Sequence, residues 1–420
     1  MVTTMKHEQR RILSPSPFKL LHNPRVDRSG DYGEDRRLAF GGGHFLNASR
    51  EITGWPGYAQ TPLTALPGLA DRAGVSMLFY KDEGERFGLG SFKALGGAYA
   101  VFRLLTREIE RRAAASGVTV TDLISRRYEE VTRNITVSCA TDGNHGRSVA
   151  WGAQLFGCRC VIYVHASVSE GRVSAIVAYG AEVRRISGNY DDAVRAAARN
   201  AASEGWYVVS DTSYPGYTEV PRDVMQGYTV MVDEALSQLD GRTATHVFVQ
   251  GGVGGLAAAV TAHLWERFGS RRPRAVIVEP KNADCLYMSA LRGELTVVHG
   301  TLDTIMAGLS CGEPSLVAWN LLADGADDFM TIDDAAAAES MCLLAKPALG
   351  DPAIVAGESA VAGLAGMLLA AQDAAASIAL DLSPESVVLV FGTEGDTDPE
   401  LYRSIVGRDG AAVRNTAVQA

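Results

Sequence analysis

Lys93 is the residue whose type and setting best suit covalent chemistry. It lies in the stretch KDEGERFGLGSFKALGGAY shortly after Gly88 and Gly90, and glycines allow a tight turn before a helix. Apolar residues at helical spacing follow, so we expect Lys93 at the N-terminus of a helix. The helix dipole is positive there and opposes protonation of an amine. Because a neutral amine can attack a carbonyl group, this position suits a Schiff-base lysine, although a solvated surface lysine is the simpler alternative.

Four further loops combine glycine with polar side chains directly after strand-like runs. They cover residues 141–146, 211–214, 251–255 and 393–397. In open parallel sheets, ligands bind at the carboxyl ends of the strands. We therefore expect ligand-binding residues in these loops.

The loop GGVGG precedes a predicted helix. Its residues are Gly251, Gly252, Val253, Gly254 and Gly255. Amide groups and a helix dipole form an anion site at such a turn, and glycine lets a phosphate group approach closely. No Lys-Ser or Lys-Thr pair follows, so the loop is not a Walker A motif. Two alternatives stay open, namely a dinucleotide fingerprint completed by Ala257 and Glu279, or a tight turn that binds nothing.

The loop TDGNHG carries a second group of polar residues. Asn144 can both donate and accept hydrogen bonds. Asp142 is an acid at the start of a predicted helix, where its charge is stabilised, and a simple helix cap is the alternative role. No second histidine or cysteine stands at ligand spacing from His145, so no metal site is predicted.

Alternating strands and helices must position these loops. Strand candidates at residues 135–139, 159–165, 182–186 and 206–210 alternate with helix candidates, and a second set follows at 246–249, 274–279 and 386–391. This alternation predicts an α/β fold with two parallel-sheet domains, helices on both sheet faces and the active site in the cleft between the domains.

The predicted domains divide the chain unevenly. We expect an irregular N-terminal arm over residues 1–50, a large domain from residues 51–93 and 225–420, and a small domain from residues 94–224. The apolar run at residues 359–380 contains Gln372 and Asp373, so we interpret it as a buried or interface helix.

Composition limits the range of partners and compartments. The 420 residues are 47% hydrophobic, which suits substantial cores, and the formal net charge of −10 argues against nucleic acid as a partner. No membrane span and no signal peptide are predicted. The 6 cysteines are too few for a disulfide framework, so we expect a cytoplasmic protein, with a Cys285–Cys311 disulfide as a minor alternative.

The order of these motifs resembles that of a known enzyme superfamily. Lys93 after Ser-Phe, then GNHG and then GGVGG, resembles the fold-type II pyridoxal-phosphate enzymes, which include tryptophan synthase β and threonine dehydratase. The segments PGYAQTPLTALPGLA, KDEGERFGLGSFKALGG, ATDGNHGRSVAWGA, TIMAGLSCGEPS and GTEGDTDPE resemble the 2,3-diaminopropionate ammonia-lyase family over residues 56–401. Gly90 departs from the family pattern, which has asparagine there.

The resemblance implies a pyridoxal-phosphate site. Lys93 would bind the cofactor as a Schiff base and later act as a base at the substrate Cα. Phe92 would pack against the cofactor ring, Asn144 would hydrogen-bond its oxygen, and the amides of Gly251 to Gly255 would hold its phosphate. Thr393 would face the pyridine nitrogen. A hydroxyl there leaves this nitrogen largely unprotonated, which favours loss of a β-substituent over transamination.

The resemblance also implies how the substrate is bound and deprotonated. Asp142 would remove the α-proton of the D-substrate, and Lys93 that of the L-substrate, from opposite faces. Asp211 would hold the cationic β-amino group. The residues expected at the substrate are Thr141, Asp142, Gly143, His145 and Asp211.

The predicted activity is β-elimination of D- and L-2,3-diaminopropionate to aminoacrylate, which hydrolyses to pyruvate and ammonia. The expected cofactor is pyridoxal 5′-phosphate, the partner a small amino acid, and the assembly a homodimer. Alternatives are a pyridoxal-phosphate β-replacement synthase, an ammonia-lyase for another β-substituted alanine, an NAD-dependent oxidoreductase built on the Gly252 fingerprint, and a silent cofactor-binding protein.

Overall fold

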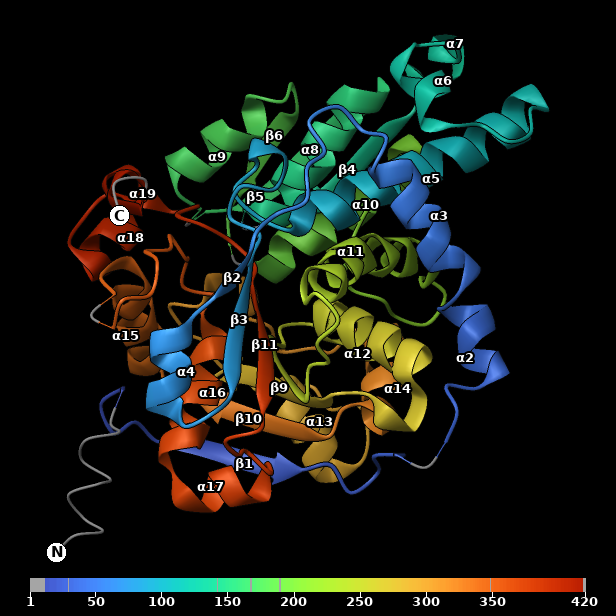
Figure 1. The fold of residues 1–420 in the computed structure, drawn as a ribbon. Helices are drawn as coiled ribbons and strands as arrows, with labels where there is room; N and C mark the ends of the chain where they lie inside the picture. Colours follow the sequence, from blue (N-terminus) through green and yellow to red (C-terminus); the bar gives the residue numbers. More distant parts are fainter. Residues whose placement is uncertain are drawn as a thin grey trace, which may run out of the picture. The chain divides into compact units, whose positions relative to one another are not determined.

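The chain folds into two compact units of α/β structure. The computed structural model describes residues 12–28, 30–141, 143–166, 168–188, 190–347 and 349–417. Unit 1 takes its described residues from Met1–Leu38, Gln60–Glu85 and Met231–Ala420, and unit 2 from Ala39–Ala59 and Arg86–Val230 (Figure 1). Lys93, which the sequence-based boundaries put in the large domain, therefore lies in unit 2.

Unit 1 contains a seven-stranded sheet in the order β1-β10-β9-β8-β11-β3-β2. The five inner strands are parallel, and the edge strands β1 and β2 pair antiparallel with their neighbours. In sequence order the strands are β1 (Phe18–His22), β2 (Leu63–Ala65), β3 (Met77–Asp82), β8 (His246–Gln250), β9 (Arg274–Pro280), β10 (Asp328–Ile332) and β11 (Val387–Gly392).

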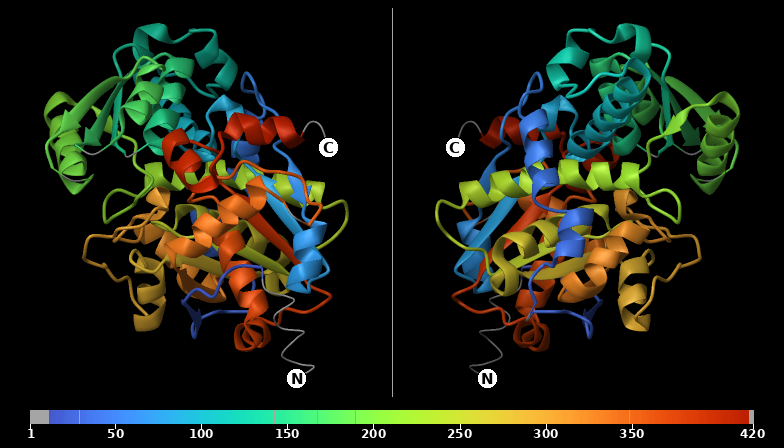
Figure 2. Two further views of the ribbon diagram at one scale, coloured as in Figure 1. Left: turned by 90° about the vertical axis from the view of Figure 1, so that its left-hand side faces the viewer. Right: turned by 90° about the vertical axis from the view of Figure 1, so that its right-hand side faces the viewer.

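Helices cover both faces of this sheet, as neighbouring side chains of β10 illustrate. Met330 belongs to the core that α16 (Ala362–Gln372) packs against, whereas the ring of Phe329 lies 6.3 Å from that of Trp319 in α14 (Leu316–Gly325). Successive strand residues point to opposite faces, so α16 and α14 cover opposite sides, which the two panels of Figure 2 view in turn. The other helices of unit 1 are α4 (Pro67–Ala73), α12 (Gly255–Phe268), α13 (Cys285–Arg292), α15 (Asp334–Ala345), α17 (Ala374–Ala379), α18 (Pro399–Val406) and α19 (Gly410–Ala417).

Unit 2 is built on a smaller sheet in which all four strands are parallel. The order is β6-β5-β4-β7, with β4 (Thr136–Ala140), β5 (Arg159–His165), β6 (Glu182–Ile186) and β7 (Tyr207–Val208). Its helices are α3 (Gly43–Ile52), α5 (Lys93–Ala113), α6 (Val120–Ile124), α7 (Glu129–Thr132), α8 (Asn144–Phe156), α9 (Glu170–Val177) and α10 (Tyr190–Glu204). Two helices, α2 (Glu34–Ala39) and α11 (Glu219–Gln238), run from one unit into the other. The predicted α/β class with parallel sheets is confirmed.

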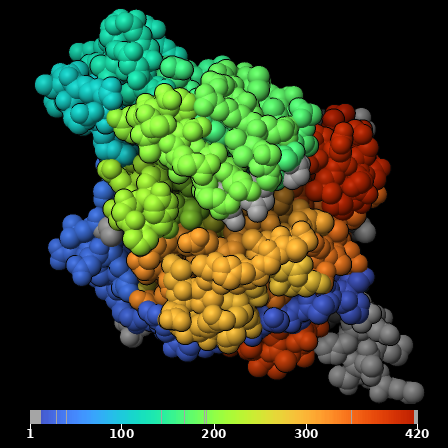
Figure 3. All heavy atoms as spheres, turned by 180° about the vertical axis from the view of Figure 1, so that it is seen from behind, coloured from blue at the N-terminus to red at the C-terminus, as the bar shows by residue number. Residues whose placement is uncertain are grey.

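The N-terminal region is more regular than the expected arm. Its described part contains β1, α2 and α3 rather than irregular chain. β1 pairs with β10, and Lys19 lies over the ring of Tyr287 at 5.8 Å, so this segment runs beside the amber atoms around α13 (Figure 3). Pairing between strands some three hundred positions apart leaves no local signal in five residues, which explains the difference.

The apolar run at residues 359–380 forms two helices instead of one. α16 is almost wholly buried, and Asp373 ends it and caps α17 by accepting a hydrogen bond from the amide of Ala376 at 2.8 Å. Across the described part of the chain, no helix has the length and apolar character needed to cross a membrane.

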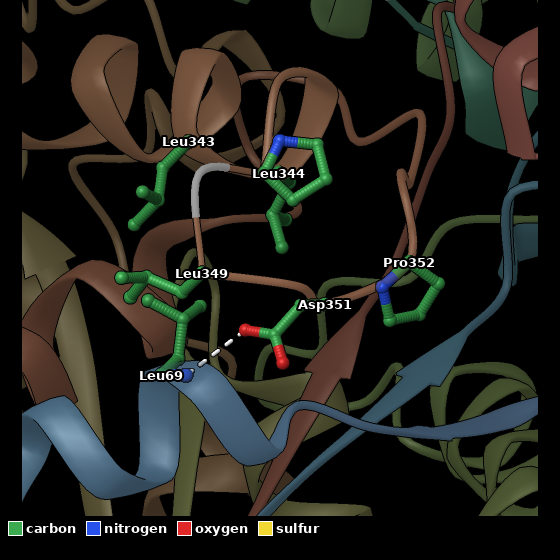
Figure 4. Close-up of a pocket in the computed structure, with 7 residues that line it drawn as sticks. Leu69, Leu343, Leu344, Leu349, Asp351 and Pro352 are labelled. Carbon is green, nitrogen blue, oxygen red and sulfur yellow. Dashed lines mark hydrogen bonds between the residues drawn. The ribbon is translucent and has the colours of Figure 1, made fainter. Parts of the chain in front are cut away.

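Figure 4 shows a small apolar pocket on unit 1. Its lining includes Leu69, Leu343 and Leu349, and Asp351 accepts hydrogen bonds from the amides of Gly68 and Leu69 at the start of α4. Within the described residues it contains none of the side chains predicted to bind a ligand, so we interpret it as a packing feature.

Candidate active site

Lys93 is the first residue of α5, as the sequence predicts. Gly88 and Gly90 supply the preceding turn with φ angles of 70° and 74°, a region that favours glycine. The lysine Nζ lies 2.6 Å from Oδ2 of Asp211, and both side chains are largely buried, with 21% and 17% of their surfaces exposed. The amine of Lys93 therefore lies next to a negatively charged carboxylate as well as at the positive end of a helix.

The carboxyl group of Asp211 is held as an anion. Burial raises its pKa, but the positive charge of Lys93, the electrostatic effect of His145 and the hydrogen bond from Lys93 lower it more. The net result is a pKa below the ordinary range of an aspartate. A fixed anion beside an amine can bind a cationic group and can hold a proton on nitrogen.

His145 is oriented toward Asp211 by the backbone. Its Nε2 lies 2.9 Å from the carbonyl oxygen of Val209, and because a carbonyl only accepts, this nitrogen carries the proton. The other ring nitrogen, Nδ1, lies 3.8 Å from Oδ2 of Asp211. Nδ1 is buried, and no side chain or backbone group among the described residues hydrogen-bonds to it. Unit 2 thus brings Lys93, Asp211 and His145 together.

The TDGNHG loop is ordered by its own side chains. The hydroxyl of Thr141 accepts hydrogen bonds from the amides of Gly143 and Gly146, at 3.0 and 3.1 Å. Asn144 begins α8, and its Oδ1 accepts a hydrogen bond from Arg147 Nη2 at 2.8 Å, which fixes the orientation of the amide. Asp142, predicted to be a base, lies outside the described residues.

Close packing fixes the backbone around Lys93, and the sequence did not single out the residues responsible. Ser148 Oγ donates to the carbonyl oxygen of Lys93 at 2.6 Å, and a Cβ on Gly97 would lie 2.2 Å from this oxygen of Ser148. The rings of Phe92 and Tyr228 have centroids 4.6 Å apart. The signal that could have identified Ser148 is its place on the buried face of α8, four residues after Asn144.

The GGVGG loop has the backbone geometry of an anion site. Gly252 and Gly254 have φ angles of 62° and 97°, and Gly254 caps α12 without any side-chain hydrogen bond. A Cβ on Gly251 would lie 2.6 Å from Cγ of Glu279, so that position also requires glycine. The backbone therefore turns tightly at the start of α12, a helix of 14 residues, and no side chain caps this helix. Binding of a phosphate group requires both features.

The dinucleotide alternative is wrong, because Glu279 is not available to a ligand. Its side chain is fully buried, and its two oxygens accept hydrogen bonds from the amides of Leu286 and Tyr287 at 3.0 and 2.7 Å. Burial raises the pKa of Glu279 to about 8, and these two amides offset the effect only in part. Glu279 holds the start of α13 instead of a ribose.

Thr393 lies beside this loop in unit 1, just beyond the end of β11. Its hydroxyl is buried and accepts a hydrogen bond from Nε2 of Gln250, the last residue of the neighbouring strand β8, at 2.9 Å. Unit 1 thus brings together the glycine loop, Thr393 and Gln250, a residue that the sequence did not indicate.

No group of three potential metal ligands occurs among the described residues. Cys285 and Cys311, the pair considered for a disulfide, are both thiols.

Comparisons with known proteins identify the family. A family model described as pyridoxal-phosphate dependent enzyme matches residues 55–392. Diaminopropionate ammonia-lyase of Escherichia coli strain K12 is 42% identical over 360 residues, covering 83% of this chain and 88% of the relative. The crystal structure of the selenomethionine holo form of the Escherichia coli enzyme matches with a TM-score of 0.86 and 37% identity, covering 94% of this chain and 97% of that one. Its complex with an aminoacrylate-PLP azomethine reaction intermediate matches with a TM-score of 0.83, 37% identity and coverage of 94% and 98%. The chain therefore belongs to the diaminopropionate ammonia-lyase family of pyridoxal-phosphate dependent enzymes.

Proposed function

We propose that this chain converts 2,3-diaminopropionate to pyruvate and ammonia with pyridoxal phosphate as cofactor. The observation that carries the proposal is the pairing of Lys93 with Asp211 at 2.6 Å, at the start of α5, in a chain of this family. A lysine amine and a fixed anion are the two groups that a diamine substrate requires, one for the cofactor and one for its second ammonium group.

The residues present fit the cofactor. The turn at Gly251 to Gly255 leaves no room for side chains at Gly251 and begins α12 without a side-chain cap, which suits the phosphate group. Asn144 would hydrogen-bond the ring oxygen and Thr393 the ring nitrogen, while Phe92 would pack near the ring. When bound, pyridoxal phosphate withdraws electrons from the substrate Cα and so makes its proton removable.

The amine of Lys93 and the carboxylates of Asp142 and Asp211 would then bind the substrate and remove its α-proton. Lys93 Nζ would accept the α-proton of the L-substrate and Asp142 that of the D-substrate, because the two enantiomers present this proton to opposite faces. Asp211, an anion already placed beside an amine, would hold the β-ammonium group until it leaves. Of the three groups, Asp211 is held by its surroundings in the charged form that its role requires.

The overall reaction balances with one molecule of water. Loss of the β-amino group as ammonia gives aminoacrylate, and the reaction of aminoacrylate with water gives pyruvate and a second ammonia. The named state of the Escherichia coli relative, an aminoacrylate-PLP azomethine, supports this order of steps.

The experiment that tests this proposal is product analysis of the cofactor-loaded protein. With either enantiomer of 2,3-diaminopropionate, we expect one pyruvate and two ammonia for each substrate consumed, with or without an added thiol. A thioether amino acid formed in place of pyruvate when thiol is added would assign the chain to β-replacement and overturn the proposal.

We further propose a cytoplasmic homodimer. All six cysteines are thiols, which suits a reducing compartment. Leu38 and Leu46, only eight positions apart in the chain, are 72% and 71% exposed, and an interface with a second copy would cover these groups. Light scattering coupled to gel filtration should give twice the mass of 44.6 kDa, and a monomer mass would overturn the dimer.

A further inference from the structure

We propose that Gln250 is a positioning residue that makes the hydroxyl of Thr393 a hydrogen-bond donor toward the cofactor, an inference that rests on the proposed function. Gln250 donates a hydrogen bond to the hydroxyl of Thr393. The hydroxyl then directs its own proton at the pyridine nitrogen, which stays a hydrogen-bond acceptor. The argument starts from the contacts of the Gln250 side chain.

The amide nitrogen of Gln250 is surrounded by oxygens. Nε2 lies 2.8 Å from the carbonyl oxygen of Phe391, 3.1 Å from that of Ala360 and 2.9 Å from Oγ1 of Thr393. Two of these three neighbours are carbonyl groups, which only accept, so the amide must present its NH₂ group to this side. An amide NH₂ group has two hydrogens and cannot accept, so its hydrogens are shared among the three oxygens, and Thr393 Oγ1 acts as an acceptor toward it.

A hydroxyl group that accepts from one side still has its own proton to donate. Thr393 is 3% exposed, and its Oγ1 donates to no partner among the described residues. A buried hydroxyl that lacks an acceptor is costly, so the proton is expected to point at a group that binds beside the ends of β8 and β11. Under the proposed function, that group is the pyridine nitrogen.

The other end of the Gln250 side chain shows that the amide is not needed for packing. Gln250 is 2% exposed, and its Oε1 is buried without a hydrogen-bond partner among the described residues. An apolar side chain of the same length would fill the space without this unmade bond. The amide is therefore best explained by its NH₂ group, which joins the hydroxyl of Thr393 to the carbonyls of Phe391 and Ala360.

The chemical consequence concerns the acidity of the bound cofactor. A donor facing the pyridine nitrogen stabilises its unprotonated form, whereas an acceptor would stabilise the protonated form. An unprotonated ring withdraws electrons more weakly from the substrate Cα, which favours departure of a β-substituent over reprotonation. Gln250 would thus tune the reaction through Thr393 without touching substrate or cofactor.

The test compares the binding of two cofactors, pyridoxal phosphate and 1-deazapyridoxal phosphate, which lacks the ring nitrogen. The proteins are the wild type, Gln250→Met, Thr393→Val and the double variant, each first checked for folding by circular dichroism and thermal melting. Met has the length of Gln and no NH₂ group. Gln250→Leu serves as a second replacement where the Met variant fails to fold.

We expect the wild type to bind pyridoxal phosphate about five- to tenfold more tightly than the deaza analogue. This ratio corresponds to the free energy of one hydrogen bond, the one from Thr393 to the pyridine nitrogen. Gln250→Met and Thr393→Val should each remove this preference, and the double variant should bind no worse than Thr393→Val alone. Thr393→Ser, which keeps the hydroxyl, should retain both the preference and its dependence on Gln250.

Two results would overturn the inference and leave the cofactor assignment intact. One is an equal loss of affinity for both cofactors in Gln250→Met, which would mean that the residue supports only the fold. The other is a wild type that binds the two cofactors equally. A wild type that binds neither would overturn the proposed function together with this inference.

Discussion

Nζ of Lys93 and Oδ2 of Asp211 lie 2.6 Å apart, although 118 positions separate the two residues in the chain. The amine that we propose as the cofactor-binding group is thus paired with an anion. When the amine is used for the cofactor, the carboxylate stays behind as a ready partner for another cation. This pairing is the reason we propose that Asp211 sets the specificity for a diamine.

Asp211→Asn should selectively impair turnover of the diamine. The neutral amide cannot pair with the β-ammonium group, and a hydrogen bond to a charged group contributes about 1.5–3 kcal/mol. We expect kcat/KM for 2,3-diaminopropionate to fall about tenfold to a hundredfold. The change for serine, whose β-substituent is a neutral hydroxyl, should be much smaller. Equal losses on both substrates would mean that Asp211 acts in a step common to them and does not read the β-ammonium group.

Gly252→Ala should weaken cofactor binding beyond the effect of backbone strain. Its φ of 62° costs an alanine about 1 kcal/mol, and the nearest atom to the added Cβ is the backbone oxygen of Gly308 at 3.3 Å, a tight contact that a small shift of Gly308 would relieve. The methyl group should instead interfere with the phosphate group and raise the dissociation constant of pyridoxal phosphate at least tenfold.

Gly241→Ala is the matched control for this strain. Gly241 has a φ of 78° and no atom within 4 Å of an added Cβ, and it lies outside the glycine loop. Its replacement should lower thermal stability to a similar extent and leave cofactor affinity unchanged. If both variants bind the cofactor equally well, the GGVGG loop is not the phosphate site.

The buried carboxyl of Glu279 should make the stability of unit 1 depend on pH. Burial raises its pKa to about 8, and Asp284 adds to the shift, so the folded state retains a proton that the unfolded state releases near pH 4.5. Its contribution is fully present below pH 4.5 and is lost as the pH rises through 8. The difference in free energy of unfolding between wild type and Glu279→Gln should therefore fall by about 1.4 kcal/mol per pH unit in this window.

Chemical denaturation at pH 5, 6, 7 and 8 measures this effect. Glu385→Gln is the control, because it makes the same replacement at an exposed position. A difference between wild type and Glu279→Gln that stays constant with pH would show that Glu279 is ionised in the folded protein. In that case the two amides at the start of α13 outweigh burial.

Asp142→Asn should separate the two enantiomers of the substrate. We propose Asp142 as the base for the D-isomer and Lys93 as the base for the L-isomer, the roles that the resemblance to the family implies. Removing a general base costs about a hundredfold to ten-thousandfold in rate. We expect that loss for pyruvate release from D-diaminopropionate and a minor change for the L-isomer. Comparable losses on both isomers would assign Asp142 to substrate binding.

The local parts of the site were predictable because they depend on neighbouring residues. Glycines followed by apolar residues at helical spacing indicated that a helix begins at Lys93, and the structure confirms it. The strand-loop-helix order around TDGNHG and GGVGG was also correct, with α8 starting at Asn144 and α12 at Gly255. In each case the turn chemistry and the periodicity lie within about fifteen residues.

Long-range contacts left no such signal. The hydrogen bond from Gln250 to Thr393 joins residues 143 positions apart, and it exists because β8 and β11 are neighbours in the sheet. The same holds for β1, a five-residue strand whose partner β10 begins at residue 328. The dinucleotide fingerprint gave a wrong alternative for a related reason. The sequence did not reveal that Glu279 accepts hydrogen bonds from the amides of Leu286 and Tyr287.

The central claim is that Lys93 carries the cofactor, and the most direct test is chemical. The protein loaded with pyridoxal phosphate should absorb visible light and lose this absorption on reduction with borohydride. Peptide mapping by mass spectrometry should then place one pyridoxyl group on Nζ of Lys93, and Lys93→Ala should show no label. A pyridoxyl group on any other lysine, or none after reduction of a visibly yellow protein, would contradict the account.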